Sequence, residues 1–128
     1  MTKRDYFDKQ VEWVLAALPR KVLKMLEEVP LHVEDRPSKQ LMKTLQIEYD
    51  DELCGYFSGI PLDRKQEMNA RLPNSVTIFR KGIVAESLDE SGKVHRNELR
   101  RQIRITILHE LAHYHGIGEE ELEMLGYG

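Results

Sequence analysis

One stretch near the C-terminus restricts the fold more than any other, because residues 97–115 are predicted to form a helix with very little polar surface. Apolar residues at helical spacing cover one side and much of a second, namely Leu99, Ile103, Ile107 and Leu111, then Ile105, Leu108 and Ala112. A helix that is apolar nearly all round is normally buried. The rest of the chain is therefore expected to pack around this helix.

The remaining face of this helix carries the start of the pattern H-E-x-x-H-x-x-G-x-x-E, which runs from His109 to Glu119. An α-helix turns by about 100° per residue, so His109 and His113 lie one above the other and can share a metal ion. Glu110 is offset from both, close enough to reach a water on that metal without binding it. This is the position of a general base.

Gly116 follows His113 by three residues, where helices commonly end in a left-handed residue. The chain can then fold back and bring the Glu119 carboxylate to the metal as third ligand, leaving a fourth tetrahedral position for water, as in catalytic zinc sites. Glu120 and Glu121 are alternative third ligands.

A purely structural interpretation of the pattern is the alternative. Histidines four residues apart can be a polar stripe on an amphipathic helix, and residues 119–121 can favour the N-terminus of a following helix over residues 119–125. However, the expected number of chance H-E-x-x-H matches in a chain of this composition is only roughly 0.02. The pattern therefore favours a metal site.

Composition and charge restrict the possible partners and the compartment. A chain of 128 residues, 41% hydrophobic and 32% charged, predicts one soluble domain over residues 1–128. The net charge of -3 gives no basic footprint, so nucleic acid is not expected as a partner. No stretch resembles a signal peptide or a membrane span, and Cys54, the only cysteine, is interpreted as a small buried hydrophobe. We therefore expect a cytoplasmic protein with no membrane partner.

Periodicity and turn residues predict the other elements. Helices are expected over residues 5–18, 19–28 and 37–45, and strands over residues 29–33, 53–59, 75–80 and 83–87, with a loop at 60–74 and a turn at 89–92. Pro30 places the first strand at a sheet edge, and Gly55 and Gly59 indicate a bulge or a close backbone approach in the second. Strands in the middle third with helices on both sides predict an α+β fold.

The motif and these segments resemble the small bacterial zincin-like metallopeptidase family of single-domain proteins. The resemblance covers nearly the full length, through residues 7–19, 33–38, 55–62 and 72–80. It implies a minimal zincin-like domain, in which a small mixed sheet packs against a central active-site helix, with additional N-terminal helices. It also implies Zn²⁺ held by His109, His113 and Glu119, with Glu110 as base. The related metzincins differ, because they carry His or Asp where this chain has Glu119.

The expected function is zinc-dependent hydrolysis of peptide bonds by a metal-activated water, with Glu110 as general base. The peptide or protein substrate would lie along an exposed strand edge, for which residues 76–80 are the candidate. The group that stabilises the oxyanion is left open, and a structural role is favoured for each candidate: Tyr56, Arg80, Tyr114 and Tyr127.

Two other functions remain possible from the sequence. The small size of the chain favours a metal-stabilised binding or regulatory protein without peptidase activity. A hydrolase of another bond would resemble the small bacterial zinc hydrolases of ribosomal RNA maturation, which use a related three-histidine motif. Glu110 and the absence of a basic patch count against that last function.

Overall fold

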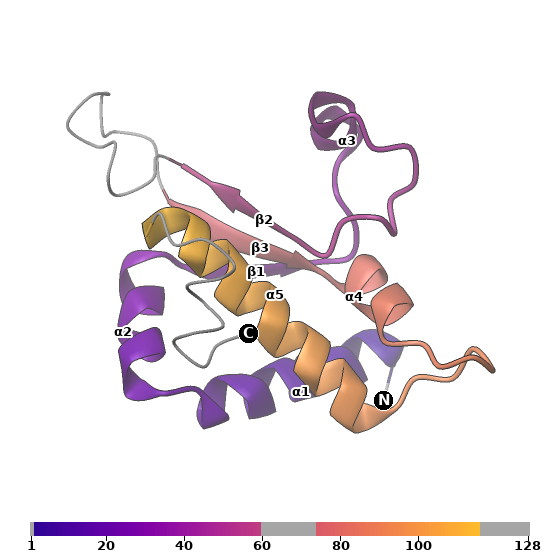
Figure 1. The fold of residues 1–128 in the computed structure, drawn as a ribbon, viewed down its shortest axis with the longest axis horizontal. Helices are drawn as coiled ribbons and strands as arrows, with labels where there is room; N and C mark the ends of the chain where they lie inside the picture. Colours follow the sequence, from indigo (N-terminus) through magenta and orange to yellow (C-terminus); the bar gives the residue numbers. More distant parts are fainter. Residues whose placement is uncertain (1, 60–73, 116–128) are drawn as a thin grey trace.

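The sheet is mixed and three-stranded in the computed structural model, which describes residues 2–59 and 74–115, with the strand order β1 (Leu31–Glu34), β3 (Ser75–Phe79), β2 (Gly55–Ser58). β1 runs parallel to β3, and β2 runs antiparallel to it. Helix α5 (Arg96–His115) crosses one face of this sheet, and α1 (Lys3–Ala17) packs against α5 (Figure 1). This is the α+β arrangement predicted, with a small mixed sheet packed against a central helix.

Helix α5 is the centre of the hydrophobic core. Its apolar side is fully buried, at Leu99, Ile103, Ile107 and Leu111, and it contacts α1, β2, β3 and a short helix α4 (Arg80–Glu86). The buried core cluster comprises Phe7, Val11, Val14, Leu18, Val22, Val29, Val76, Ile78, Ile83, Leu99, Ile103, Ile107, Leu108, Leu111 and Tyr114. Burying this side fixes which face of α5 remains for polar residues.

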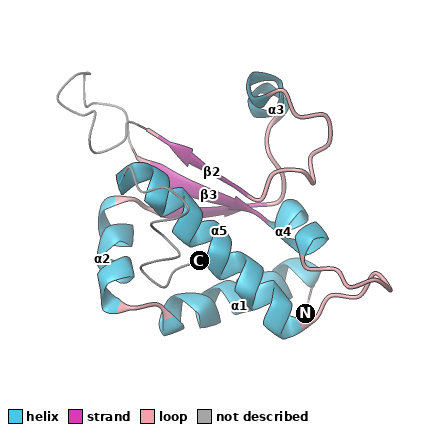
Figure 2. Cartoon of the chain, in the orientation of Figure 1, coloured by secondary structure: helices cyan, strands magenta, loops and turns pink. Residues whose placement is uncertain are grey.

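Local sequence signals explain where the other helices begin. The Thr2 hydroxyl caps α1 and the Asp5 carboxylate bonds back to the Thr2 amide, which is a capping box. Pro19 directly precedes α2 (Arg20–Glu28), and the Ser38 hydroxyl caps α3 (Lys39–Leu45) (Figure 2). The helices predicted over residues 5–18, 19–28, 37–45 and 97–115 are thus confirmed to within about two residues at each end.

The strands predicted over residues 29–33, 53–59 and 75–80 are confirmed, and β1 lies at an edge as expected. Residues 76–80 do not form an exposed edge, however, and that prediction was wrong. β3 is the central strand, since the Val76 amide donates to the Pro30 carbonyl at 2.9 Å and the Phe79 amide donates to the Cys54 carbonyl at 2.8 Å. Periodicity identifies a strand but not its place in the sheet.

The strand predicted over residues 83–87 was also wrong, because these residues belong to α4 and its C-cap, Ser87. A short apolar run is ambiguous between a strand and a buried helical turn, and tertiary packing decides here. Gly82 lies very close to the segment before β2, because a Cβ atom on Gly82 would stand 2.1 Å from the Leu53 carbonyl oxygen. Ile83 is fully buried in the core. The chain therefore turns into a helix directly after β3.

The turn predicted at residues 89–92 is confirmed, because the Asp89 carboxylate accepts hydrogen bonds from the Ser91 and Lys93 amides. Residues 60–73 of the predicted loop, the helix predicted over residues 119–125 and Tyr127 lie outside the described residues. Among the helices that the structure describes, none is long and apolar enough to cross a bilayer.

Candidate functional site

The described residues of the motif, His109, Glu110 and His113, lie in the C-terminal half of α5. Glu110 is largely buried, His109 is half-buried, and His113 is exposed. The His113 Nδ1 atom lies 3.6 Å from a Glu110 carboxylate oxygen. One turn earlier, the Thr106 hydroxyl donates to the Gln102 carbonyl at 2.7 Å, so this side chain is bonded along its own helix. Glu110 thus lies beside His113, and His109 is close enough to affect the pKa of its carboxyl.

Glu110 has an unusual electrostatic environment. Burial raises the pKa of its carboxyl, while the neighbouring His113 and His109 and a hydrogen bond with the backbone of Phe57 act in the opposite direction. Burial prevails, so the pKa lies above the ordinary value. A carboxylate with a raised pKa is better matched to accepting a proton near neutral pH than an exposed one.

Strand β2 brings this backbone group to Glu110. In an antiparallel pair, the residues alternate between those that hydrogen-bond the partner strand and those that point away from it. The Phe79 amide bonds to the Cys54 carbonyl, and the register pairs Tyr56 with Thr77, so the backbone groups of Gly55 and Phe57 point away from β3. The Phe57 backbone that bonds Glu110 is therefore on the outer side of β2.

Gly55 allows β2 to lie close to α5 at this point. A Cβ atom on Gly55 would stand 2.6 Å from the Thr106 methyl group and 3.2 Å from the Glu110 Cγ atom. The close backbone approach that the sequence indicated for this strand is therefore confirmed at Gly55. The sequence predicted no site role for Gly55 or Phe57, although this glycine was the signal that could have identified them.

Replacing Gly55 by alanine is expected to push Thr106 and Glu110 aside, because the added methyl group has no room. We expect a loss of about 1–2 kcal/mol in the free energy of unfolding, together with faster hydrogen exchange at the Phe57 amide. Urea denaturation and NMR measure the two effects. Ser58→Ala, on the exposed end of the same strand, is the control and should change neither. An unchanged Phe57 amide in Gly55→Ala would contradict this geometry.

A cleft of about 310 Å³ adjoins Glu110 between α5, α4 and the start of β2. It is lined by Glu52, Leu53, Cys54, Gly55, Glu86, Gln102, Ile105, Thr106, His109 and Glu110. Burial, with the nearby carboxylates of Glu86 and Glu110, raises the pKa of the Cys54 thiol to about 11. Cys54 is therefore a neutral, half-buried thiol at physiological pH, which agrees with its interpretation as a small hydrophobe.

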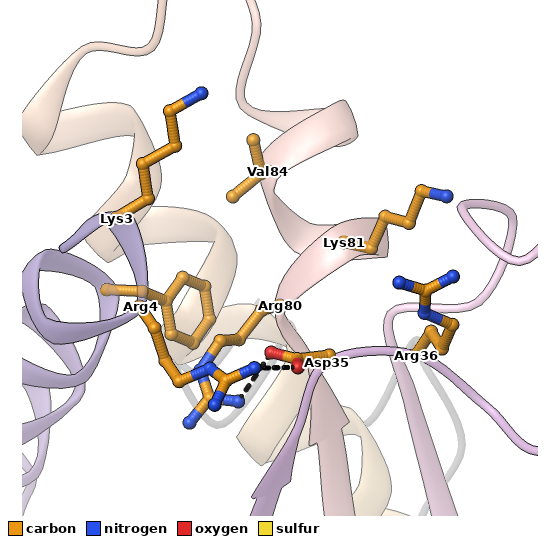
Figure 3. Close-up of a pocket in the computed structure, with 8 residues that line it drawn as sticks. Lys3, Arg4, Asp35, Arg36, Arg80, Lys81 and Val84 are labelled. Atoms are coloured by element: carbon orange, nitrogen blue, oxygen red, sulfur yellow. Dashed lines mark hydrogen bonds and ion pairs between the residues drawn. The ribbon is translucent and has the colours of Figure 1, made fainter.

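The residues considered as oxyanion stabilisers are scattered. Arg80 lies in a different pocket, where Figure 3 shows it beside Asp35. Its guanidinium donates to Asp35 at 2.9 Å and to Asp8 at 3.0 Å. Tyr114 is buried, with its ring centroid 5.8 Å from that of Phe57. Tyr56 is next to Phe57 on β2, and successive side chains on a strand point to opposite faces of the sheet. The Tyr56 side chain therefore points to the face opposite that of Phe57. The structure thus favours structural roles for Arg80 and Tyr114.

Replacing Arg80 by leucine is expected to lower the melting temperature by about 5 °C, because it leaves Asp8 and Asp35 facing each other without their shared cation. The Arg80 side chain is only 16% exposed, whereas Arg101, which pairs with Glu98, is 62% exposed. Arg101→Leu is therefore the control and should change the melting temperature by less than 2 °C or so. Equal effects in the two variants would contradict a structural role for Arg80.

The pH dependence of the free energy of unfolding also tests the contact between Arg80 and Asp35. Burial opposes ionisation of Asp35, but the Arg80 hydrogen bond and the Arg4 charge outweigh it, so its pKa is lowered. A folded-state pKa below the unfolded value, roughly 4 for Asp, gives stability that is present above that pH and lost as the pH falls. As the pH falls below about 4, the free energy of unfolding should therefore decrease less in Arg80→Leu than in the native protein.

The metal ligands proposed from the sequence are only partly within the described chain. Among the residues described, no group of three or more His, Cys, Asp or Glu side chains is arranged to hold a metal ion. The third proposed ligand, Glu119, and its alternatives Glu120 and Glu121 lie outside those residues. His109 and His113 are accessible imidazoles one helical turn apart, with a carboxylate beside them. This donor set suits Zn²⁺.

A comparison with known protein families shows which family this chain is related to. The family model described as zincin-like metallopeptidase matches residues 26–127. The chain belongs to this family. Membership confirms the resemblance seen in the sequence, and the matched range includes β1 to β3 and all of α5. For a member of the zincin-like metallopeptidase family, a metal cofactor and a peptide or protein substrate are implied. No curated protein matches the chain.

Proposed function

We propose that this zincin-like protein is a zinc-dependent peptidase that hydrolyses peptide bonds, with His109, His113 and Glu119 as metal ligands and Glu110 as general base. Bound zinc would polarise the scissile carbonyl and activate a water molecule for attack. Glu110 takes the proton from the attacking water and passes it to the leaving amine. Membership of the zincin-like metallopeptidase family supports the reaction type.

The observation that carries this proposal is the environment of Glu110. Its side chain is 14% exposed, its pKa is raised by burial, and it lies beside the two histidines and in the wall of an open cleft. A buried carboxylate with a raised pKa, next to histidines and a cleft, is typical of a functional site rather than of a surface ion pair.

The edge of β2 is the best place in the described structure for the backbone of a substrate. Extended peptides bind sheet edges through main-chain hydrogen bonds. Among the described residues β2 pairs with β3 on one side, and the Gly55 backbone and the Phe57 carbonyl point away from β3, close to Glu110. β2 therefore replaces residues 76–80 as the proposed substrate-binding edge.

One contact favours the alternative, a metal-stabilised binding or regulatory protein. Glu110 already has a hydrogen-bond partner in the backbone of Phe57. A carboxylate engaged in this way can simply tie α5 to β2. In that case the protein would bind zinc without cleaving peptides.

Incubation with a library of peptides from a digested proteome separates the two functions. The full chain is compared with and without added zinc and after treatment with a chelator, and new peptide termini are identified by mass spectrometry. The peptidase predicts cleavage that the chelator abolishes and zinc restores. Stoichiometric zinc without cleavage in any condition would contradict peptidase activity and support the binding protein.

A further inference from the structure

A second concave surface, which we call the basic groove, lies away from Glu110, between the start of α1, the end of β1 and α4. It has a volume of about 350 Å³, and its lining includes Val84 and five cations, namely Lys3, Arg4, Arg36, Arg80 and Lys81. Figure 3 shows Lys3 and Lys81 on either side of Val84, with Arg80 and Asp35 beyond them. In Figure 1 this end of the molecule, near the N-terminus and α4, is opposite the C-terminal end of α5.

Cations outnumber carboxylates in the basic groove. Among the described residues, four of its five cations contact three carboxylates: Asp35 is shared between Arg4 and Arg80, Asp8 also binds Arg80 at 3.0 Å, and Asp50 is shared between Arg36, at 3.6 Å, and Lys81, at 2.7 Å. These shared carboxylates leave guanidinium and ammonium hydrogens for a further acceptor. Lys3 has no ion pair with any other described residue. The groove is thus locally positive in a chain whose net charge is -3.

The charged side chains surround apolar ones. Phe7 and Val84 line the groove between the cations, and the exposed fractions of the Arg4 and Arg36 side chains are 62% and 64%. Such a surface complements a ligand with an apolar side chain flanked by carboxylates. Nucleic acid and anionic membrane fit less well, because they present dense negative charge without an apolar side chain between the charges.

We propose that the basic groove is a docking site for an acidic segment of a partner protein, in which an apolar side chain lies over Val84 between Asp or Glu residues. The carboxylates of the segment replace water molecules around Lys3, Arg36 and Lys81. Arg80 and Arg4 position Asp35 and keep the base of the groove rigid. This proposal is independent of the peptidase reaction, because it uses none of the residues near Glu110.

Selection from a random peptide library displayed on phage tests the proposal on the full chain. Selected peptides should be enriched in Asp and Glu around an apolar residue. A synthetic peptide of the selected consensus should bind at least tenfold more weakly to Lys3→Glu/Arg36→Glu, by fluorescence anisotropy. Because the groove cations are exposed, its affinity should also fall as salt is raised. Lys3→Glu alone breaks no ion pair with a residue that the structure describes, and it should weaken binding in the same direction.

A matched variant controls for net charge. Lys9→Glu/Arg20→Glu changes the charge of the chain by the same amount at exposed positions outside the groove, and should bind the peptide like the native protein. Peptides without acidic enrichment, or equal binding to both double variants, would overturn the proposal. So would vesicles containing phosphatidylserine, or single-stranded RNA, if either bound through the groove cations while no selected peptide did.

Discussion

Glu110→Gln is expected to reduce peptide hydrolysis by about 10²–10⁴-fold, the contribution typical of a general base. Glutamine has nearly the same shape as glutamate and can still accept a hydrogen bond at the position near Phe57, but it cannot take a proton from water. Zinc content and melting temperature should therefore stay within error of the native protein. The rate is measured with a cleaved peptide from the library, under conditions where the native chain is saturated with zinc.

Glu86→Gln is the control for this variant, since Glu86 lines the same cleft and is exposed. It should retain activity within a few-fold, because the proposed mechanism gives it no proton to transfer. Native-like activity in Glu110→Gln would remove Glu110 as the base. Loss of zinc together with activity would instead assign Glu110 to metal binding.

Gly82→Ala is expected to cost about 3 kcal/mol in the free energy of unfolding, against the usual trend for a helix. Alanine normally stabilises a helix interior relative to glycine by about 1 kcal/mol. Here the added methyl group would stand 2.1 Å from the Leu53 carbonyl oxygen and 2.6 Å from its carbon, and both atoms belong to the backbone. The segment before β2 must therefore move away from α4, and urea denaturation measures the cost.

The control for Gly82→Ala is a glycine in open space. A Cβ atom on Gly92 would meet nothing within 4 Å, and its backbone φ of 83° is in the left-handed region. Asparagine tolerates that conformation, so Gly92→Asn should change stability by less than about 0.5 kcal/mol. A stabilised Gly82→Ala would mean that helix propensity outweighs the contact with Leu53.

The central helix could be predicted from the sequence because its burial and its motif depend on spacing within one segment. The apolar residues from Leu99 to Leu111 fix the buried side of α5, so that His109 and His113 lie on its more exposed face and Glu110 lies at the edge of the buried side. Such a relation follows from the helical repeat alone. The α+β class followed similarly from the succession of elements.

What the sequence did not predict depends on contacts between distant segments. The central place of β3 follows from its pairing with β1 on one side and β2 on the other, and no pattern within residues 75–79 encodes that order. α4 replaced a predicted strand because Gly82 lies against Leu53. The hydrogen bond between Phe57 and Glu110 likewise joins residues far apart in the chain. Among the described residues, the glycines at positions 55, 59 and 82 mark such close approaches.

The central claim is that one divalent ion binds between His109 and His113, and elemental analysis of the purified full chain tests it most directly. We expect about one zinc per native chain after dialysis, and less than about a tenth of that in His109→Ala/His113→Ala, with the melting transition still cooperative. Substoichiometric metal in the native chain, or equal zinc in both proteins, would contradict the claim.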